Sequence, residues 1–411
     1  MKKITVVGCG MGSENELTKR AVDALKSSQL VIGSERIVKS FSFLKDKEIE
    51  ISPLKRLKDI VEKINETKSE TIAIAVSGDT SFFSMARLIN KNKDKIDGEF
   101  SLSFLPGISS LSYFLSKICL SQEGLKAVSF HGKTAGVLPL VCHNEKLFGI
   151  TSSSLDIKSI SKTLTKAGFG GLKIFIGENL SYENERIIET TVEKALDMDF
   201  SDLLVFLIQN ENPKGYVSFK DEDFIRGSVP MTKREIRQIA INSLGITKGK
   251  TVYDIGSGTG SVSCEIGFNF PDCEVLSFEK EKEAIELTLQ NKERFDCQNI
   301  RLIEKTAPDG FKEEKAPDFA FVGGSAGKLE AILDELFKKN PYVRVCVTAI
   351  SLNTLSVLLK YIEKHNIKDY EIIEAQISRT KKLGSQNLLF GANPVFVVTF
   401  GGKEVGKLEE N

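Results

Sequence analysis

The chain has 411 residues, more than one hydrophobic core usually serves, so we expect two domains. Lys plus Arg and Asp plus Glu number 56 each, a balance that disfavours a polyanionic partner such as nucleic acid. The seven cysteines form no C-x-x-C pair, and no stretch approaches the roughly 20 apolar residues of a membrane-spanning helix. We therefore expect a reduced cytoplasmic protein without a disulfide framework, a metal site or a membrane segment.

The first 210 residues alternate short β-branched runs with amphipathic segments, which predicts an α/β domain with parallel strands. A predicted strand at Ile4–Val7 leads into the glycine loop at residues 8–12. A helix should follow from a capping box formed by Ser13 and Glu16. Further strands are expected at Leu30–Ile32, Thr71–Val76, Ser101–Leu105, Leu172–Ile176 and Leu203–Ile208.

A break in periodicity at residues 209–228, where a proline, two glycines and many charged residues gather, predicts a linker between domains at 1–208 and 229–403. The second domain again has an α/β pattern. Its strands are expected at Thr251–Ile255, Glu274–Phe278, Ile300–Ile303, Phe319–Val322 and Val343–Ala349. Extended runs near Tyr370–Ile377 and Pro394–Phe400 predict a hairpin that completes the sheet.

A glycine loop in the second domain carries the strongest ligand signal. The strand Thr251–Ile255 runs directly into Gly256-Ser257-Gly258-Thr259-Gly260, and a helix follows at once. Glu279 ends the next strand, where an acidic side chain can accept both hydroxyls of a ribose. The D-x-G-x-G-x-G form beginning at Asp254 is typical of S-adenosylmethionine methyltransferases rather than dinucleotide enzymes. A tight turn without a ligand is the alternative, and the position of Glu279 disfavours it.

Two neighbouring features have a structural and a functional interpretation. Thr232 and Glu235 form a predicted capping box, which explains Thr232 by itself, but its place before the glycine strand also puts it near the cofactor. Gly323 and Gly324 follow the strand Phe319–Val322, at the end of a sheet where α/β proteins bind ligands. A plain turn explains these two glycines equally well.

Three loops of the first domain are expected to meet in one cleft, because each follows an apolar strand. They lie at residues 77–80, 105–110 and 128–133. A dinucleotide site is disfavoured, since the first glycine loop has G-x-G-x-G spacing and no acid ends the next strand. Asp79 has a turn or helix-cap role as its alternative, and His131 a structural one.

The chain resembles the tetrapyrrole (corrin and porphyrin) methylase family across roughly residues 1–205, through VVGCGMGSENELT, VIGSER, SGDTSFFSMARL, LPGISSLSYFLSKICL, VSFHGK and GENLSYENERI. From about Val229 to Gly402 it resembles the decarboxylating corrin methyltransferases, through PMTKREIR, VYDIGSGTGSVSCEIG, KTAPDGF, PDFAFVGGSAGKL, VTAISLNTL and GANPVFVVT. The order of these two unrelated domains is more specific than any one motif.

The resemblance implies a two-subdomain α/β methylase unit followed by a Rossmann-like class I methyltransferase domain, each with one S-adenosylmethionine. The first domain would methylate carbon 5 of precorrin-6B or its cobalt form. The second would methylate carbon 15 and remove carbon dioxide from the ring-C acetate. The implied cofactor residues are Gly78, Asp79, Ser109 and Ser110 in the first domain, and Thr232, Gly256, Ser257, Gly258, Thr259, Gly260, Glu279 and Ala307 in the second. Candidate substrate contacts are Gly10, His131, Gly323 and Gly324. The expected partners are a small-molecule corrinoid and further copies of the chain.

The chemistry requires little from side chains beyond alignment, because a sulfonium loses its methyl group by in-line displacement. The macrocycle itself can accept the electrons of a departing carboxylate. Catalytic residues are therefore not assigned. Two alternatives are another small-molecule or RNA methyltransferase fused to a degenerate partner, and a noncatalytic S-adenosylmethionine sensor. The balanced charge disfavours the RNA version, and two complete sites without a DNA-binding motif disfavour the sensor.

Overall fold

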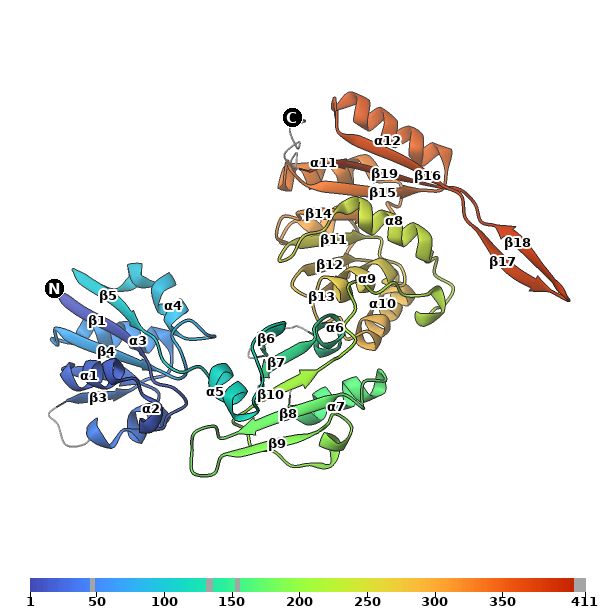
Figure 1. Ribbon diagram of the computed structural model, residues 1–411. Coiled ribbons are helices and arrows are strands. Elements are labelled where there is room, and N and C mark those ends of the chain that lie inside the picture. Colours follow the sequence, from blue (N-terminus) through green and yellow to red (C-terminus); the bar gives the residue numbers. More distant parts are fainter. Residues whose placement is uncertain (45–48, 131–135, 152–155, 403–411) are drawn as a thin grey trace, which may run out of the picture. The chain divides into compact units, whose positions relative to one another are not determined.

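The computed structural model describes residues 1–44, 49–130, 136–151 and 156–402. Two compact units make up the chain (Figure 1). The first comprises Met1–Lys133 and Asn144–Glu211, and the second comprises Thr134–His143 and Asn212–Asn411. Among the helices in the described parts of the chain, none has the length and apolar character needed to cross a bilayer.

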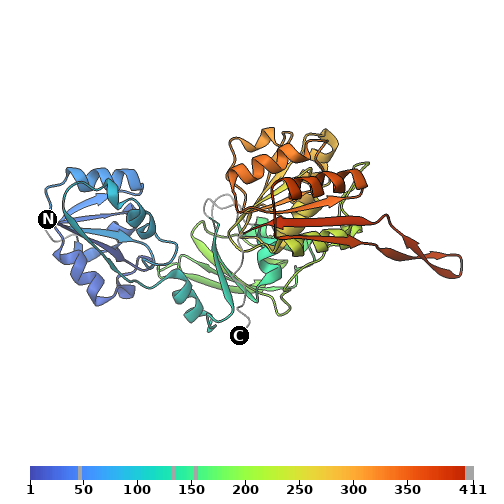
Figure 2. The same ribbon diagram turned by 90° about the horizontal axis from the view of Figure 1, so that it is seen from above.

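The first unit contains a five-stranded parallel sheet in the order β3-β2-β4-β1-β5. Its strands are β1 (Lys2–Gly8), β2 (Leu30–Gly33), β3 (Glu50–Pro53), β4 (Thr71–Val76) and β5 (Phe100–Leu105). Apolar side chains of α1 (Lys19–Ser27) and α2 (Glu35–Ser40) pack on one face, and those of α3 (Leu57–Glu66) and α4 (Ala86–Lys91) pack on the other. Figure 2 shows these helices on both faces of the sheet.

The start of α1 differs from the predicted one. Ser13 caps only a short 3-10 turn, η1 (Glu14–Glu16), by accepting a hydrogen bond from the Asn15 amide at 3.3 Å. The helix proper begins at Lys19, where the Thr18 hydroxyl accepts from the Ala21 amide at 3.2 Å. The predicted capping box at Ser13 is therefore wrong, because Thr18 is the better placed of two possible caps. Two further 3-10 turns lie between the strands of this sheet in the sequence: η2 (Ser42–Leu44) and η3 (Lys93–Lys95).

A second five-stranded sheet of the first unit has the order β6-β7-β10-β8-β9. Its elements are β6 (Leu125–Ser129), β7 (Lys146–Ile150), β8 (Lys173–Glu178), β9 (Arg186–Thr191), β10 (Leu204–Gln209), α5 (Ser110–Lys117), α7 (Ile157–Lys166) and η4 (Lys194–Asp197). Only β6 and β7 pair in parallel, and the other neighbours are antiparallel. The sequence predicts parallel strands throughout, but β8 and β9 are joined by a short loop without a helix, which permits only antiparallel pairing.

The sheet of the second unit has seven strands in the order β13-β12-β11-β14-β15-β19-β16. Its strands are β11 (Thr251–Ile255), β12 (Glu274–Phe278), β13 (Ile300–Ile303), β14 (Phe319–Val322), β15 (Arg344–Ala349), β16 (Tyr370–Ala375) and β19 (Val395–Gly401). The first five are parallel, and β19 is antiparallel to both β15 and β16. The helices are α8 (Arg234–Leu244), α9 (Ser261–Asn269), α10 (Lys282–Arg294), α11 (Leu329–Lys339) and α12 (Leu352–Lys364), with a 3-10 turn η6 (Asp309–Phe311). Apolar side chains of α11 and α12 form one core with the sheet, and α8 lies against β14, β15 and β19.

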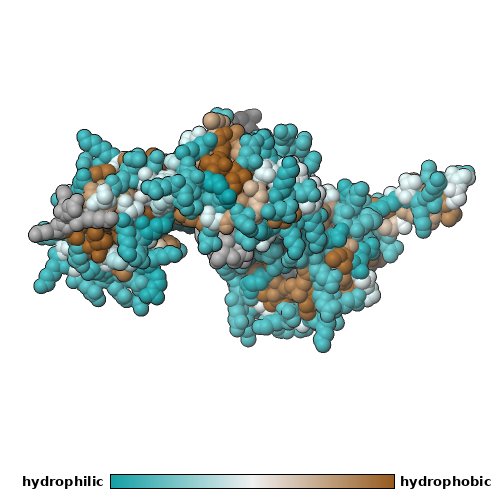
Figure 3. Space-filling view, turned by 90° about the horizontal axis from the view of Figure 1, so that it is seen from below, coloured by the Kyte–Doolittle hydropathy of each residue, from teal (hydrophilic) through white to brown (hydrophobic). Residues whose placement is uncertain are grey.

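An unpredicted ribbon interrupts the predicted closing hairpin. Between β16 and β19, the strands β17 (Ser378–Leu383) and β18 (Gln386–Gly391) pair with each other and with no other strand among the described residues (Figure 1). Apolar and polar side chains lie next to one another along it (Figure 3), and Leu389 is 74% exposed. The charged β17 sequence SRTKKL lacks the apolar alternation of a half-buried strand, so pattern reasoning overlooks it.

Part of the predicted linker belongs to the second unit. Phe219, Asp221 and Phe224 are buried, and the Phe219 ring lies 4.2 Å from that of Phe295. A 3-10 turn, η5 (Asp221–Asp223), forms here. Aromatic residues in this segment pack into the second unit, which periodicity does not reveal.

Helix α6 (Val137–His143) also groups with the second unit, although β6 and β7 on either side of it in the chain belong to the first. The Leu138 amide donates to Asp296 Oδ2 at 2.9 Å. The His143 ring nitrogens lie 2.7 Å and 3.1 Å from the carbonyl oxygens of Lys214 and Phe268. The second unit therefore includes a helix that the sequence assigns to the first domain.

Candidate functional site

Three glycine-bearing loops meet at the carboxyl ends of β1, β4 and β5 in the first unit. Gly10 and Gly78 exchange two backbone hydrogen bonds, with N to O distances of 3.2 Å and 2.6 Å. A Cβ atom at Gly107 would lie 2.6 Å from the Gly78 carbonyl oxygen, so only glycine permits this approach. His131, from the third predicted loop, lies outside the described residues.

A cavity of about 280 Å³ opens beside these loops. Its lining combines residues from both sheets of the first unit: Met11, Arg36, Ser77, Gly78, Phe82, Phe83, Ser110, Ser129, Ile150, Gly177, Leu180, Leu203, Leu204 and Val205. Gly78 and Ser110, two of the predicted cofactor residues, are among them. A mostly apolar cavity with few polar groups is the usual form of a small-molecule site.

Asp79 and Ser109 hold the loops in place. Asp79 Oδ2 accepts from the Gly107 amide at 2.9 Å, and Oδ1 accepts from the Ser81 amide at 2.8 Å and from its hydroxyl. Burial would raise the pKa of Asp79, but the hydrogen bonds from Ser81 and Gly107 bring it below its usual value. The Ser109 hydroxyl accepts from the Ser112 amide at 3.0 Å and caps α5. Both side chains therefore have structural partners, which for Asp79 agrees with the turn or cap interpretation.

Sequence reasoning missed the pair formed by Arg36 and Tyr182. Arg36 Nη1 donates to the Met11 carbonyl oxygen at 2.8 Å and to Tyr182 Oη at 2.6 Å. A Cβ atom at Gly12 would collide with the Tyr182 hydroxyl. The third glycine of the first loop is therefore the sequence signal that a side chain approaches there.

In the second unit the glycine loop follows β11, whose sheet neighbours are β12 on one side and β14 on the other, so the strand order reverses here. Gly256, Gly258 and Gly260 have φ values of +70°, +57° and +72°, in the left-handed region that favours glycine. A Cβ atom at Gly256 would lie 2.7 Å from the Gly324 carbonyl oxygen, so the loops after β11 and β14 touch. The carboxyl ends of strands at such a position are where open α/β sheets bind ligands.

Glu279, at the end of β12, faces the same loop. Its Oε2 accepts from the Gly258 amide at 3.0 Å, while Oε1 accepts from the Lys280 amide at 2.7 Å. Ala307, buried, follows β13, and Gly323 follows β14 with its amide 3.0 Å from the Ile255 carbonyl oxygen. Four adjacent strands thus place the predicted residues Gly256–Gly260, Glu279, Ala307 and Gly323–Gly324 at one edge of the sheet.

Three buried polar atoms around this loop have no hydrogen-bond partner among the described residues: Asp254 Oδ1, Ser257 Oγ and Thr259 Oγ1. Burial raises the pKa of Asp254 to about 6, although Ser263 donates to its other oxygen from both its amide and its hydroxyl. Buried polar atoms are normally paired, so the loop fits a ligand that carries polar groups.

The segment before the glycine loop, at the start of α8, makes other hydrogen bonds than those of the predicted capping box. Helix α8 begins at Arg234, and its N-cap, Lys233, makes no side-chain cap bond. Asp221 Oδ1 instead accepts from the Arg234 amide at 3.0 Å, and the Glu235 carboxylate pairs with Arg379. The predicted Thr232–Glu235 capping box is therefore wrong, because an acceptor distant in sequence, Asp221, caps the helix and a distant donor, Arg379, binds the Glu235 carboxylate.

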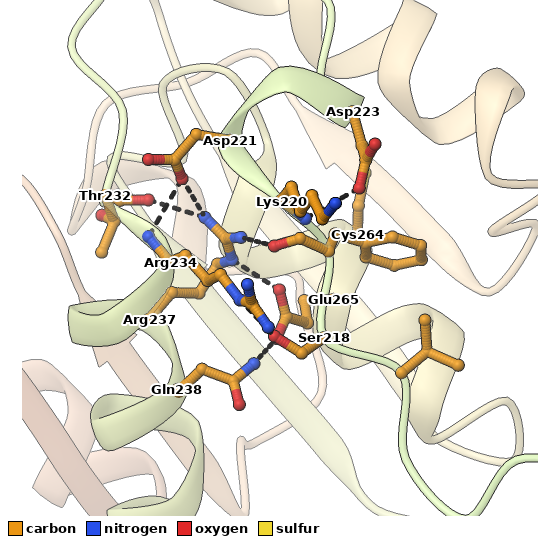
Figure 4. Close-up of polar contacts among 12 residues, drawn as sticks. Ser218, Lys220, Asp221, Asp223, Thr232, Arg234, Arg237, Gln238, Cys264 and Glu265 are labelled. Carbon is orange, nitrogen blue, oxygen red and sulfur yellow. Dashed lines mark hydrogen bonds and ion pairs between the residues drawn. The ribbon is translucent and has the colours of Figure 1, made fainter. Parts of the chain in front are cut away.

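Thr232 is instead connected to a buried charge network around Arg237 (Figure 4). Arg237 and Glu265 are both fully buried, and Arg237 Nε lies 2.6 Å from Glu265 Oε2. The other guanidinium nitrogens donate to the carbonyl oxygens of Thr232 and Phe219 at 2.8 Å and 2.7 Å. Burial raises the pKa of Glu265 and the Arg237 charge opposes this rise. The network joins α8, the helix after the glycine loop and the segment that carries Thr232.

Two parts of the chain match known protein families. Residues 3–196 match the tetrapyrrole (corrin/porphyrin) methylases, and residues 223–400 match the precorrin methyltransferase domain. The chain is 34% identical over 181 residues to the cobalt-precorrin-6B C(15)-methyltransferase (decarboxylating) of Salmonella typhimurium, covering 44% of this chain and 93% of that protein. It is 24% identical over 407 residues to the precorrin-6Y C(5,15)-methyltransferase [decarboxylating] of a Sinorhizobium species, covering 96% and 95% of the two chains.

A crystal structure of a precorrin-6y C5,15-methyltransferase from Geobacter metallireducens is 26% identical, covers 46% of this chain and 99% of its own, and has a TM-score of 0.43. The family matches and the fold together define the class as two S-adenosylmethionine-dependent methyltransferase domains in tandem, as predicted. The chain belongs to the precorrin-6Y C(5,15)-methyltransferase (decarboxylating) family.

Proposed function

We propose that this protein methylates carbons 5 and 15 of precorrin-6B or its cobalt form and decarboxylates the ring-C acetate, in cobalamin biosynthesis. The first unit would act at carbon 5 and the second at carbon 15, each with its own S-adenosylmethionine. The observation that carries the proposal is the presence of two separate glycine-loop sites, one in each unit. The C(15)-methyltransferase relative aligns with 44% of this chain and 93% of its own length, which supports a carbon-15 activity carried by one unit alone.

In the second unit, the residues fit a nucleoside with an amino-acid tail. Glu279 would accept hydrogen bonds from the ribose hydroxyls, and the left-handed glycines of residues 256–260 keep side chains away from the ligand. Asp254, Ser257 and Thr259 each have a side-chain oxygen without a partner among the described residues, and these oxygens would be available for further polar contacts. Bound there, S-adenosylmethionine would supply an electrophilic methyl group. Thr232 and Ala307 would border it, while Gly323 and Gly324 lie where the substrate can approach.

In the first unit, the cavity lining supports different roles for the predicted residues. Gly78 and Ser110 would contact the cofactor directly, because they line the cavity. Asp79 and Ser109 would act by fixing the loops through their hydrogen bonds to Gly107 and Ser112. Gly10 lies at the same edge through its two bonds to Gly78, beside the expected substrate.

The chain's contribution to the reaction is alignment and exclusion of water. Methyl transfer forms one carbon–carbon bond as the carbon–sulfur bond breaks, and a neutral thioether leaves. In decarboxylation, the electrons of the bond to the acetate carboxylate pass into the conjugated ring as carbon dioxide departs. An apolar lining such as that of the first cavity keeps water from competing for the methyl group.

Self-association through the β17–β18 ribbon completes the proposal. This ribbon pairs with no other described strand, and a two-stranded ribbon is marginally stable alone. Leu383, Leu388, Leu389 and Phe390 expose apolar surface along it, which a second copy of the chain would cover.

Isotope labelling tests the division between the two units. With S-adenosylmethionine carrying a ¹³C methyl group, the wild-type product should show new methyl resonances at carbons 5 and 15. Glu279→Ala should remove the label at carbon 15 only, and Gly78→Val, which adds a branched side chain at φ +72°, should remove that at carbon 5 only. Loss of both labels from either variant, in protein that remains folded, would contradict the assignment.

A further inference from the structure

Arg36 is the one charged side chain among the described residues that line the cavity of the first unit. It lies near the start of α2 and is exposed rather than buried. No described carboxylate forms an ion pair with it. An unpaired cation in a largely apolar cavity favours an anionic group on the ligand.

The described partners of the Arg36 guanidinium both bind its Nη1 group. Nη1 is occupied by the Met11 carbonyl oxygen at 2.8 Å and by Tyr182 Oη at 2.6 Å, and the guanidinium carbon lies 5.8 Å from the centre of the Tyr182 ring. Nε and Nη2 have no hydrogen-bond partner within the described part of the chain. These two groups form one edge of the planar fork, which is the edge that binds a carboxylate through two parallel hydrogen bonds.

Apolar side chains lie along the same cavity. The rings of Phe82 and Phe83 are 4.6 Å apart between centroids, and Phe83 and Leu203 are 46% and 43% exposed. Phe83 has φ +45°, a strained conformation for a bulky residue. An aromatic pair with one exposed ring, Phe83, near a fixed guanidinium fits a large apolar ring that carries carboxylates at its edge.

The geometry points to Arg36 as the residue that binds a peripheral carboxylate of the macrocycle during methylation in the first unit, with Tyr182 as its positioning residue. This inference rests on the proposed function, which supplies a corrinoid with acetate and propionate side chains. S-adenosylmethionine also carries a carboxylate. We assign the macrocycle because Arg36 is exposed and shares the cavity with the exposed Phe83 and Leu203, where a ligand much larger than the cofactor can extend.

Steady-state kinetics of the full-length protein test the inference. Arg36→Met should raise the KM for the corrinoid in carbon-5 methylation about tenfold or more, as expected for a lost charge-assisted pair, while S-adenosylmethionine still binds. Arg36→Lys should restore part of the loss, and Tyr182→Phe should raise KM less than Arg36→Met. Arg87→Met, an exposed arginine on α4 outside the cavity lining, is the matched control and should leave KM unchanged.

A substrate with methyl-esterified side chains distinguishes binding of the macrocycle from other effects, because it should erase the KM difference between wild type and Arg36→Met. Carbon-15 methylation by the same variant serves as an internal control for substrate quality. An unchanged corrinoid KM in Arg36→Met overturns the inference and leaves the proposed function intact. A raised dissociation constant for S-adenosylmethionine instead would assign Arg36 to the cofactor and also overturn it. Failure of the wild-type protein to methylate the corrinoid would overturn both.

Discussion

Replacing Arg237 by methionine should destabilise the second unit by about 4 kcal/mol, because breaking a buried ion pair costs roughly 3–5 kcal/mol. Glu265, also fully buried, would keep neutral donors, namely Tyr216, Gln238 and the Phe219 backbone. Asp221 would still pair with Arg379, with Nη1 3.1 Å from Oδ2, so the cost falls mainly on Glu265.

The loss of stability in Arg237→Met should depend on pH, since burial already raises the pKa of Glu265 above its unfolded value. Stability from a group with a raised folded pKa is present at low pH and lost as pH rises through that pKa. Without the Arg237 charge the pKa rises further. The defect of Arg237→Met should therefore be larger at pH 8 than at pH 5.

Hydrogen exchange followed by mass spectrometry is the suitable assay, because two units need not unfold in one step and the chain has no tryptophan. Peptides from α8 and α9 should lose protection in Arg237→Met, and Arg237→Met/Glu265→Leu should recover most of it. Arg56→Met, which removes an exposed ion pair with Asp59, is the control and should change nothing measurable. A loss below about 1 kcal/mol, or a double variant no better than the single one, would refute the reasoning.

The remaining predictions address the second unit. Glu279→Gln should weaken S-adenosylmethionine binding there about tenfold or more in calorimetry, and equal affinity would exclude a ribose contact. Gly256→Ala should abolish that binding, because its Cβ would lie 2.7 Å from the Gly324 backbone at φ +70°, and retained affinity would contradict the close approach. Asp254→Asn should gain stability relative to wild type by up to about 3 kcal/mol as the pH rises from about 4 to about 8. The pKa of Asp254 is raised to about 6, so the stability that its protonated form contributes to the wild type is lost above that pH. Parallel pH profiles of the two proteins in hydrogen exchange would contradict this. Leu389→Lys should reduce self-association in analytical ultracentrifugation, and an unchanged oligomeric state would exclude the ribbon as the interface.

Much of the fold follows from local sequence pattern. The strands β11, β12, β13 and β14 have the predicted bounds, because short buried runs end at glycine or charged residues. Glu279 and the glycine loop come together because neighbouring parallel strands end at the same edge of a sheet. The predicted site in the second unit depends on this regularity alone.

The features that could not be predicted depend on partners distant in sequence. Arg237 and Glu265 are 28 residues apart, Arg36 and Tyr182 are 146 apart, and Arg379 and Asp221 are 158 apart. Charged side chains usually indicate a solvent-exposed face, so nothing in the local pattern marks Arg237 as buried. The packing of α6 in the second unit could not be predicted for the same reason. Its hydrogen bond from the Leu138 amide to Asp296 joins residues 158 positions apart in the sequence.

Mass spectrometry of the products tests the central claim most directly. The full-length protein is incubated with S-adenosylmethionine and either metal-free precorrin-6B or its cobalt form. A gain of two methyl groups with loss of one carbon dioxide is the predicted result, and the substrate that reacts identifies the metal state. An unchanged mass with both substrates, in protein that binds S-adenosylmethionine, would contradict the assignment of two corrinoid methylation sites.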